Sequence, residues 1–590
     1  MSGNTPTTQT GRLIQLETVL GKDALIPTHI SGSEGMSALF NYSLDVFSDT
    51  MHNLQPKDLV GTPATFVLQQ IDNSPRYFHG YIDSMVALGV QRAGQQSTYQ
   101  LTMIPWLGFL EKASNCRIFQ NKTIPDILTD VFDLYSVSDV KKKLTAPHPK
   151  HAFIVQYNET DFDFVERLMR REGIAYYFTH TSGTHTLNLV DSGLSLPTLT
   201  PEEKLYLQSG TNTFDHITSW EHSSEFVTGK VRQKAYNYKN PSDQLKVKSE
   251  VKGETSQIPR VLDVEHYRYN VDFGTASTGN PDTSIRRDEG LERERLIRGS
   301  GYYRFMQVGH IFTTDVIPAT ASWDDKGKSF AIAGVEWTAW DNTHTSQSGS
   351  DGGVGFTMNF TALKKGVLNF PMAMTEPRIF GMQTAVVNGP TGSEIHTDSL
   401  GRICVHFHWD ERPKTFNGGN TSCWMRVMQV MSGKGFGGQF TPRVGQEVVI
   451  AFEEGNPNRP FVIGGLYHGE HAPPYVDGNT LGPGTRNGIK TRSTMGGGVS
   501  NYNELYFEDK IGQEQVYLQA EKNHDVYVKN DATRTIDNNL SSRIKNNEKR
   551  KIDNVLEVEA GTKIVFKVGG STITITGSSI DIKSPTVNIN

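Results

Sequence analysis

Large apolar residues recur every eight positions in the polar stretch from Val528 to Asn554. The aliphatic positions are Val528, Ile536, Ile544 and Ile552. Four asparagines keep the same spacing: Asn530, Asn538, Asn546 and Asn554. The spacing indicates short extended segments separated by regular corners.

The same spacing continues through the blocks "LEVEAGTK", "IVFKVGGS", "TITITGSS", "IDIKSPT" and "VNIN". Each block alternates apolar and polar residues and then reaches a corner of Gly, Ser, Lys or Pro, so one face of each strand is apolar. The block "TITITGSS" leaves two choices open, because either its threonines or its isoleucines face the core. The predicted core positions of the whole repeat are Val528, Ile536, Ile544, Ile552, Ile564, Phe566, Ile580 and Ile582.

One chain cannot easily bury this apolar face. A single-chain β-helix needs roughly eighteen or more residues per coil, whereas eight residues with one corner supply one side. Three chains, each giving one side, close a triangular prism in which backbone groups pair between chains. The repeat therefore predicts an intertwined homotrimer, and the alternative is a flat or disordered repetitive tail.

The first part of the chain, to about residue 380, mixes strands with a few helices. "RYFHGYIDSMVAL" and "YQLTMIPWLGFL" are typical of strands. "TIPDILTDVFDLY" predicts a helix capped by Thr123. "ETDFDFVERLMRREG" predicts a second, capped by Thr160, ended by Gly173 and carrying a Glu166–Arg170 pair, before the buried strand "IAYYF". "SIRRDEGLERERLIRG" predicts a further helix with a solvated charged face.

Short strands with glycine turns follow from residue 381 to residue 470. "GRICVHFHWD", "SCWMRVMQV", "QEVVIAFEE" and "RPFVIGGLY" suit a small closed barrel of the OB type. Residues 471–498 are a Gly- and Pro-rich linker, and the strand pair in "NELYFEDKIGQEQVYLQAEKN" opens the repeat region, 499–590. The fold class is thus mainly β with some α.

Charge and composition exclude some classes of function. The formal net charge is −6 over 590 residues, which disfavours nucleic-acid binding. No apolar run is long enough to span a membrane, and the start "MSGNTPTTQTGRL" has no secretory signal pattern. Three cysteines form no disulfide framework and suit a reducing cytoplasm.

Two motifs resemble chemical sites. "GKGFGG" fits the G-x-G-x-x-G pattern, but a strand rather than a helix follows it, so we expect a flexible loop. Cys404, His406 and His408 alternate along one strand and, with Cys423, could form a zinc set. Ligands on one flat strand diverge, however, so we expect neither metal, cofactor nor catalytic residue.

Several motifs, in order along the chain, resemble the VgrG family, the spike proteins of the bacterial type VI secretion system. They include "CRIFQNKTIPDIL", "QYNETDFDFVERLMRREGIAYYF", "EIHTDSLGRICVHFHWD", "SCWMRVMQV", "PRVGQEVVIAFEEGNPNRPFVIGGLYH" and "NELYFEDKIGQEQVYLQAEKN". The family is similar to the hub and spike of contractile phage tails. The resemblance implies that residues 1–380 form a phage-hub-like domain on the Hcp tube, followed by the OB-fold barrel and the intertwined trimeric β-helix.

The family resemblance also implies partners. A PAAR-type protein, alone or fused to an RHS effector, is expected at the tip, which we assign to Val587, Asn588, Ile589 and Asn590. Such a spike is assembled in the bacterial cytoplasm and then secreted or delivered into the target cell, crossing its membrane transiently. Cys404 and His406 stand where the family usually has other polar residues, so the resemblance lends the zinc set no support.

Other functions remain as alternatives. The first is a spike with intrinsic hydrolase activity, but the linker of about thirty residues is shorter than the roughly 50 that a domain needs. The chain also stops at Asn590, within the repeat, so no effector domain is expected after it. The second is the tail spike of a contractile phage particle, and the third, a trimeric surface adhesin, would require a signal peptide.

Overall fold

The computed structural model describes residues 7–49, 53–91, 96–207, 215–271, 273–314, 325–343, 353–371, 376–475 and 484–589. The chain divides into two compact units. Unit 1 holds residues 1–487 and 494–496, and unit 2 holds residues 488–493 and 497–590. No helix among the described residues combines the length and apolarity that a membrane span needs.

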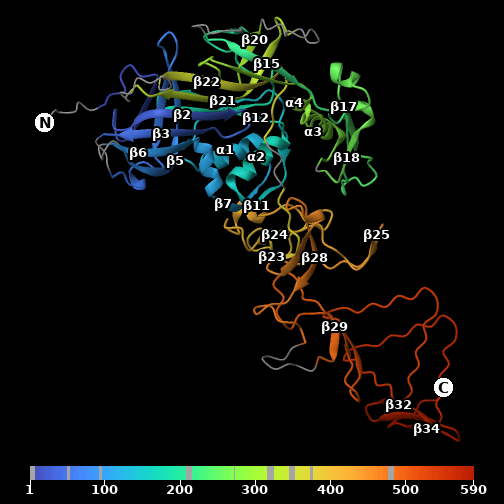
Figure 1. Cartoon of the computed structure of the whole chain (residues 1–590). Coiled ribbons are helices and arrows are strands. Elements are labelled where there is room, and N and C mark those ends of the chain that lie inside the picture. The colour runs from blue at the N-terminus through green and yellow to red at the C-terminus, as the bar shows by residue number, and fades with distance from the viewer. Residues whose placement is uncertain are drawn as a thin grey trace. The chain divides into compact units, whose positions relative to one another are not determined.

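A sheet of twelve strands forms the centre of unit 1 (Figure 1). Its strands are β1 (Ile14–Thr18), β2 (Ile26–Gly35), β3 (Asn41–Ser48), β4 (Pro63–Gln69), β5 (Pro75–Gln91), β6 (Gln96–Ile104), β14 (Lys204–Leu205), β15 (Ile217–Ser223), β19 (Leu296–Gly301), β20 (Ile311–Thr314), β21 (Ser329–Asp341) and β22 (Val354–Lys364). The main path is β1-β4-β5-β6-β3-β2-β21-β22-β19-β15, so strands from both ends of the hub sequence meet at the antiparallel pair β2–β21.

Smaller sheets and two helices pack beside the central sheet. They are β7 (Ser114–Phe119) with β11 (Ile154–Thr160), β8 (Lys122–Thr123) with β10 (Lys150–His151), β9 (Val140–Lys143) with β13 (Thr184–Val190) and β12 (Ala175–Thr181), α1 (Ile124–Phe132) and α2 (Asp161–Arg171). Both predicted caps are confirmed: the side chains of Thr123 and Thr160 accept hydrogen bonds from the N–H groups of Asp126 and Asp163. Gly173 follows α2 with a φ of +68°, which suits glycine.

The structure corrects two local predictions in this part of the hub. Glu166 does not pair with Arg170, because it lies on the buried face of α2 and accepts a 2.6 Å hydrogen bond from Tyr176. Arg170 pairs instead with Glu289, at 3.1 Å. The strand predicted in "YQLTMIPWLGFL" ends at Ile104, since Pro105 follows β6 and residues Trp106–Lys112 form a 3₁₀ helix.

The charged segment predicted as one helix is divided in a small subdomain. Strands β16 (Lys230–Lys234), β17 (Lys246–Glu250) and β18 (Glu265–Tyr269) form its sheet, with α3 (Ala276–Asp288) against β16 and β17 and α4 (Leu291–Glu294) after it. "SIRRDEGLERERLIRG" thus spans the end of α3, α4 and β19, with Gly290 between the helices. Its face is not fully solvated, because Arg286 is largely covered and bonds Glu289 and the carbonyl of Arg171.

The predicted barrel is closed. Its strands are β23 (Gln383–Asn388), β24 (Cys404–Phe407), β27 (Glu447–Phe452) and β28 (Pro460–Leu466), in the order β24-β23-β27-β28. "SCWMRVMQV" contains no regular strand, but Met425 exchanges both backbone hydrogen bonds with Ile403 beside β24. Three residues on, Met428 donates to Val462 of β28, so one short segment joins the two edges of the sheet.

Unit 2 contains two three-stranded sheets. The strands of the first are β29 (Arg486–Lys490), β30 (Glu504–Glu508) and β31 (Gln515–Gln519), and those of the second are β32 (Lys563–Val568), β33 (Ser571–Thr576) and β34 (Ile580–Lys583). The predicted strand pair is confirmed as β30–β31, with Tyr506 stacked on Tyr517. Strand β29 lies within the stretch predicted as a linker, whose residues 476–483 are outside the described ranges.

Candidate functional site

The stretch between the two sheets of unit 2 bends every eight residues. The bends fall at Glu521–Lys522, Lys529–Asn530, Asp537–Asn538, Lys545–Asn546, Asp553–Asn554 and Gly561–Thr562. Each of the four repeated asparagines is the second residue of a corner, and each of Val528, Ile536, Ile544 and Ile552 directly precedes one. The eight-residue spacing of the sequence is therefore a spacing of corners in the backbone.

Between its corners this stretch is extended, and among the described residues its backbone pairs with no strand of its own chain (Figure 1). Within the described part of the protein, residues 522–562 belong to no strand and make no backbone hydrogen bond to one another or to other segments. Every side chain in it is exposed, including Val528 at 47% and Ile552 at 51%. Fixing one residue's backbone costs about 1–2 kcal/mol, so the extended form needs partners outside the single chain.

The second sheet of unit 2 settles which face of its strands is apolar. Ile573 pairs with both Phe566 and Ile582, and Ile575 pairs with both Ile564 and Ile580. Directly opposed residues lie on the same side of a sheet, so all six apolar side chains share one face. The other face carries threonines and charged residues together with one aliphatic residue: Lys563, Val565, Lys567, Thr572, Thr574, Asp581 and Lys583.

This apolar face is open to solvent in the single chain. Phe566 is 59% exposed, Ile580 68% and Ile582 52%, so the sheet has its apolar side chains in order without a layer to cover them. A large exposed apolar face of this kind marks an interaction surface. The eight predicted core positions are thus placed on uncovered extended chain or on this face, and their burial in a trimer stays a prediction.

The predicted tip residues follow β34. Val587 is 47% exposed and Ile589 is 90% exposed, and Asn588 is also exposed. Asn590 lies outside the described residues. Residues 584–590 carry no charged side chain.

The residues considered for zinc do not converge on one point. The ring of His406 lies 2.8 Å from the carbonyl of Arg412, and that of His408 lies 3.1 Å from the hydroxyl of Thr384. Burial raises the pKa of the Cys404 and Cys423 thiols to about 12, so both thiols are protonated at neutral pH. Within the described ranges no cluster of three or more His, Cys, Asp or Glu side chains is arranged to hold a metal ion.

Sequence patterns missed a buried histidine cluster in the hub. The Nδ1 atoms of His79 on β5 and His185 on β13 lie 2.8 Å apart, and the backbone N–H of Trp106 donates to Nε2 of His185 at 3.0 Å. The backbone N–H of His79 lies 3.2 Å from Nδ1 of His180 on β12. His180 and His185 pair directly across the β12–β13 hairpin, whereas His79 on β5 is more than a hundred residues earlier, so no local spacing signals that His79 joins them.

The histidine cluster is held neutral. Because Nε2 of His185 accepts from Trp106, its proton sits on Nδ1 and is donated to Nδ1 of His79. Burial lowers the pKa of His79 to about 4, of His180 to about 3 and of His185 to about 2, and the nearby Arg76 lowers that of His180 further. This cluster is packing in the hub core rather than a catalytic arrangement.

Comparison with known families divides the chain into three matched parts. Residues 33–343 match the phage tail baseplate hub family. Residues 393–467 match the OB domain of type VI secretion and phage-baseplate injectors. Residues 487–583 match the C-terminal trimerisation domain of bacteriophage T4 gp5, and this range includes the unpaired stretch 522–562.

Individual proteins agree with this division. The chain is 34% identical to the type VI secretion system spike protein VgrG1a of Pseudomonas aeruginosa, over 90% of this chain and 80% of that one. It is 29% identical to the actin cross-linking toxin VgrG1 of Vibrio cholerae, over 85% of this chain but 44% of that longer protein. A solved Escherichia coli type VI secretion component, described as similar to the T4 tail proteins gp27 and gp5, shares the fold with a TM-score of 0.54 at 19% identity, over 77% of this chain and 100% of that one.

Proposed function

The chain belongs to the VgrG family of type VI secretion spike proteins, and we propose that three copies seat on an Hcp tube through their hubs and carry a PAAR-type protein at their tip. The observation that carries this proposal is the extended stretch 522–562, which has regular corners and no partner in its own chain. Two further copies would supply the missing strands and cover the apolar face of β32–β34. In this proposal residues 1–380 are the hub, 381–470 the barrel, 471–498 a linker and 499–590 the β-helix.

The hub end is the natural place for the tube. The phage baseplate hub family matches most of the twelve-stranded sheet. The proposed Hcp contact therefore lies at the hub rather than at the barrel or the β-helix.

The tip contact is proposed at Val587–Asn590. The exposed aliphatic side chains of Val587 and Ile589 would form a small apolar platform, repeated three times in the trimer. A partner with a flat apolar base or a strand to add suits such a platform. A PAAR protein, alone or as part of a PAAR-RHS effector, is the proposed partner.

The proposed role is mechanical and carries no catalytic step. The candidate zinc residues diverge, and "GKGFGG" lacks the helix that a dinucleotide site requires. A spike with hydrolase activity is the competing function; the relative named as an actin cross-linking toxin has a different kind of activity. Turnover of peptidoglycan, lipid or nucleotide substrates that disappears in Cys404→Ser or His408→Ala would favour it.

We place the protein in the bacterial cytoplasm during assembly and, after firing, in the medium or the target cell, with transient passage through the target membrane. The families matched also occur in phage baseplates, so the tail spike of a contractile phage particle is the second candidate. Dependence of release on the type VI apparatus of the source cell separates the two.

The tip proposal is tested by capture of the PAAR protein encoded nearby. The full chain and a chain ending at Ser584 are each co-expressed with it, purified and weighed by mass photometry. We expect the full chain to retain the PAAR protein as one copy per trimer and the shortened chain to lose it. Equal capture by two trimers of equal stability would place the docking surface elsewhere.

A further inference from the structure

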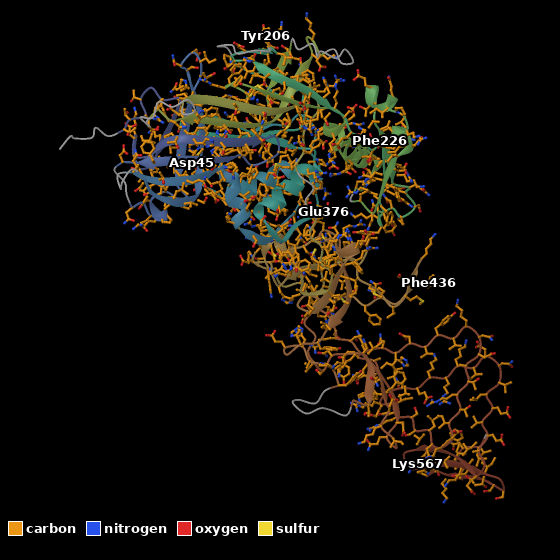
Figure 2. The ribbon with its side chains drawn as sticks, viewed as in Figure 1. Asp45, Tyr206, Phe226, Glu376, Phe436 and Lys567 are labelled. Carbon is orange, nitrogen blue, oxygen red and sulfur yellow. The ribbon has the colours of Figure 1, made fainter. Side chains whose placement is uncertain are left out.

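A thin arm leaves the barrel between its closing segment and β27. This arm, residues 428–440, contains the two-residue strands β25 (Ser432–Gly433) and β26 (Phe436–Gly437), which pair as a hairpin. Figure 1 shows β25 standing away from the barrel, and Figure 2 shows Phe436 at the projecting end. At the base of the arm, Nε2 of Gln429 donates a hydrogen bond to the carbonyl of Phe440, and Oε1 of Gln429 accepts one from the N–H of Phe440.

The glycines of "GKGFGG" make the arm thin. Gly435 and Gly437 have φ values of +77° and +144°, which a residue with a side chain rarely adopts. A Cβ on Gly433 would lie 2.3 Å from the ring of Phe436, so that ring lies directly across the opposite strand. The motif "GKGFGG", which matches the dinucleotide-binding pattern, therefore has a structural role. Its glycines allow a tight hairpin from which large side chains project without packing on a sheet.

The arm is apolar and uncovered. Its large apolar side chains are exposed as follows: Met428 65%, Val430 85%, Met431 56%, Phe436 66% and Phe440 52%. Lys434, at the turn, is its single charged residue. A two-stranded hairpin alone is marginally stable in water, and a contiguous apolar patch marks a contact surface. The arm therefore needs an apolar partner with little charge.

We infer that the arm of one copy packs on the barrel of the next copy around the trimer. The inference rests on the proposed trimeric spike. The trimerisation match begins at residue 487, twenty residues after the barrel match ends at residue 467. A segment of twenty residues spans at most about 70 Å when fully extended. Joining the three chains after this segment therefore keeps the three barrels near one another. Confinement makes docking effectively intramolecular and favours even a small contact.

The barrel also offers a surface of matching chemistry. Outside the arm, the barrel and the segment before β23 expose Phe380 at 92%, Met382 at 67% and Tyr467 at 63%. An arm that reaches a different patch on its neighbour makes a head-to-tail contact, and three such contacts close a ring. The arms would then form a belt at the level of the barrels, separate from the β-helix.

The test uses the full chain with p-benzoylphenylalanine, a photoreactive residue, in place of Phe436. The control carries it in place of Phe226, which is 57% exposed in the hub subdomain. Mass photometry first confirms that both are trimers. Irradiation should then give covalent dimers and trimers from position 436 alone, with adducts that map to residues 376–475 of another chain.

The outcomes separate the inference from the proposed function. A monomer before irradiation would reject the trimeric spike. A trimer that gives no interchain adduct, adducts within one chain, or equal adducts from both positions would reject arm docking alone.

A second measurement avoids the photoreactive residue. Amide exchange of residues 430–438 should be slowed in the parent trimer and become fast in a Met431→Ser, Phe436→Ser double variant that remains trimeric. Arm amides that exchange at the rate of free peptide in the parent would also overturn docking.

Discussion

At the scale of single residues, the histidine cluster of the hub makes the fold sensitive to acid. His79, His180 and His185 form one hydrogen-bonded group whose neutral state is required by the Trp106 and His79 contacts. Their pKa values in the folded hub, about 4, 3 and 2, all lie below the value of about 6.5 expected in the unfolded chain.

The sign of the effect follows from proton binding. Below pH 6.5 the unfolded chain binds protons at these histidines and the folded hub does not, so the free energy of unfolding falls as the pH falls. Each histidine contributes a slope of about 1.4 kcal/mol per pH unit until its own folded pKa is reached. Glu166 opposes part of this trend, because burial raises its pKa to about 8 and it stays neutral in the folded hub.

We predict that the hub loses stability steeply between pH 6.5 and pH 4. The melting temperature of the full chain, followed by the fluorescence of the buried hub tryptophans, should fall over this range. His185→Gln should lower the melting temperature at pH 7.5 and flatten its dependence on pH. A variant with the same pH dependence as the parent would show that other groups cause the acid sensitivity.

At the scale of elements, β33 presents two faces with different requirements. Ile573 lies between Phe566 and Ile582 on the apolar face, whereas Thr572 lies between Lys567 and Lys583 on the other. A carboxylate introduced at these neighbouring positions meets opposite surroundings. Substituting aspartate at position 572 and, separately, at position 573 therefore tests which face of β33 is buried.

We predict that Ile573→Asp destabilises the C-terminal region sharply and that Thr572→Asp does not. In the trimer, three carboxylates at position 573 would be buried without partners, at a cost of several kcal/mol each. At position 572 each carboxylate would lie beside two lysines in water. Trimer melting followed by circular dichroism gives the comparison, and equal melting of the two variants would mean that the apolar face is not buried.

At the scale of the whole molecule, the two units differ in what they need. Unit 1 has its own extensive core, built on the central sheet and the barrel. Unit 2 has no comparable core. Its apolar side chains are all at least partly exposed in the single chain. Association is therefore a requirement of the C-terminal unit rather than of the hub.

We predict that removing the residues after about position 500 leaves a folded hub and barrel but weakens the trimer. Mass photometry at nanomolar concentration should show mainly monomers for the shortened chain and trimers for the full chain. A shortened chain that is equally trimeric would move the main association surface into unit 1, where the arm is the first region to examine.

Local patterns in the sequence predicted local structure well. The caps at Thr123 and Thr160 depend on residues three positions apart, and the corners of the repeat depend on its spacing of eight. One local side-chain pair was wrong, and contacts over long separations were missed. Arg170 has a partner more than a hundred residues away, Glu289, in place of the neighbour Glu166.

The same distinction holds in the candidate site. The alternation in "TITITGSS" could not choose between threonine and isoleucine, because either set repeats every two residues. The turns before and after β33 set its register against Ile564 and Ile580, and that register is a property of the paired strands. The arm was missed because its glycines suggested a flexible loop. Its role as a contact surface is indicated by the exposure of its apolar side chains, which the sequence does not show.

The regular corners of residues 522–562 also bear on the order of folding. Each extended segment can gain backbone partners only when two other chains are present, so this part of the molecule cannot complete its fold during synthesis of one polypeptide. The hub and barrel have local cores and can fold first. The spike then closes in a step whose rate depends on chain concentration, and once three chains are wound together, none can leave until many rungs open at once. Such a structure persists through slow unfolding rather than through equilibrium stability, which suits a part that must withstand one abrupt mechanical load.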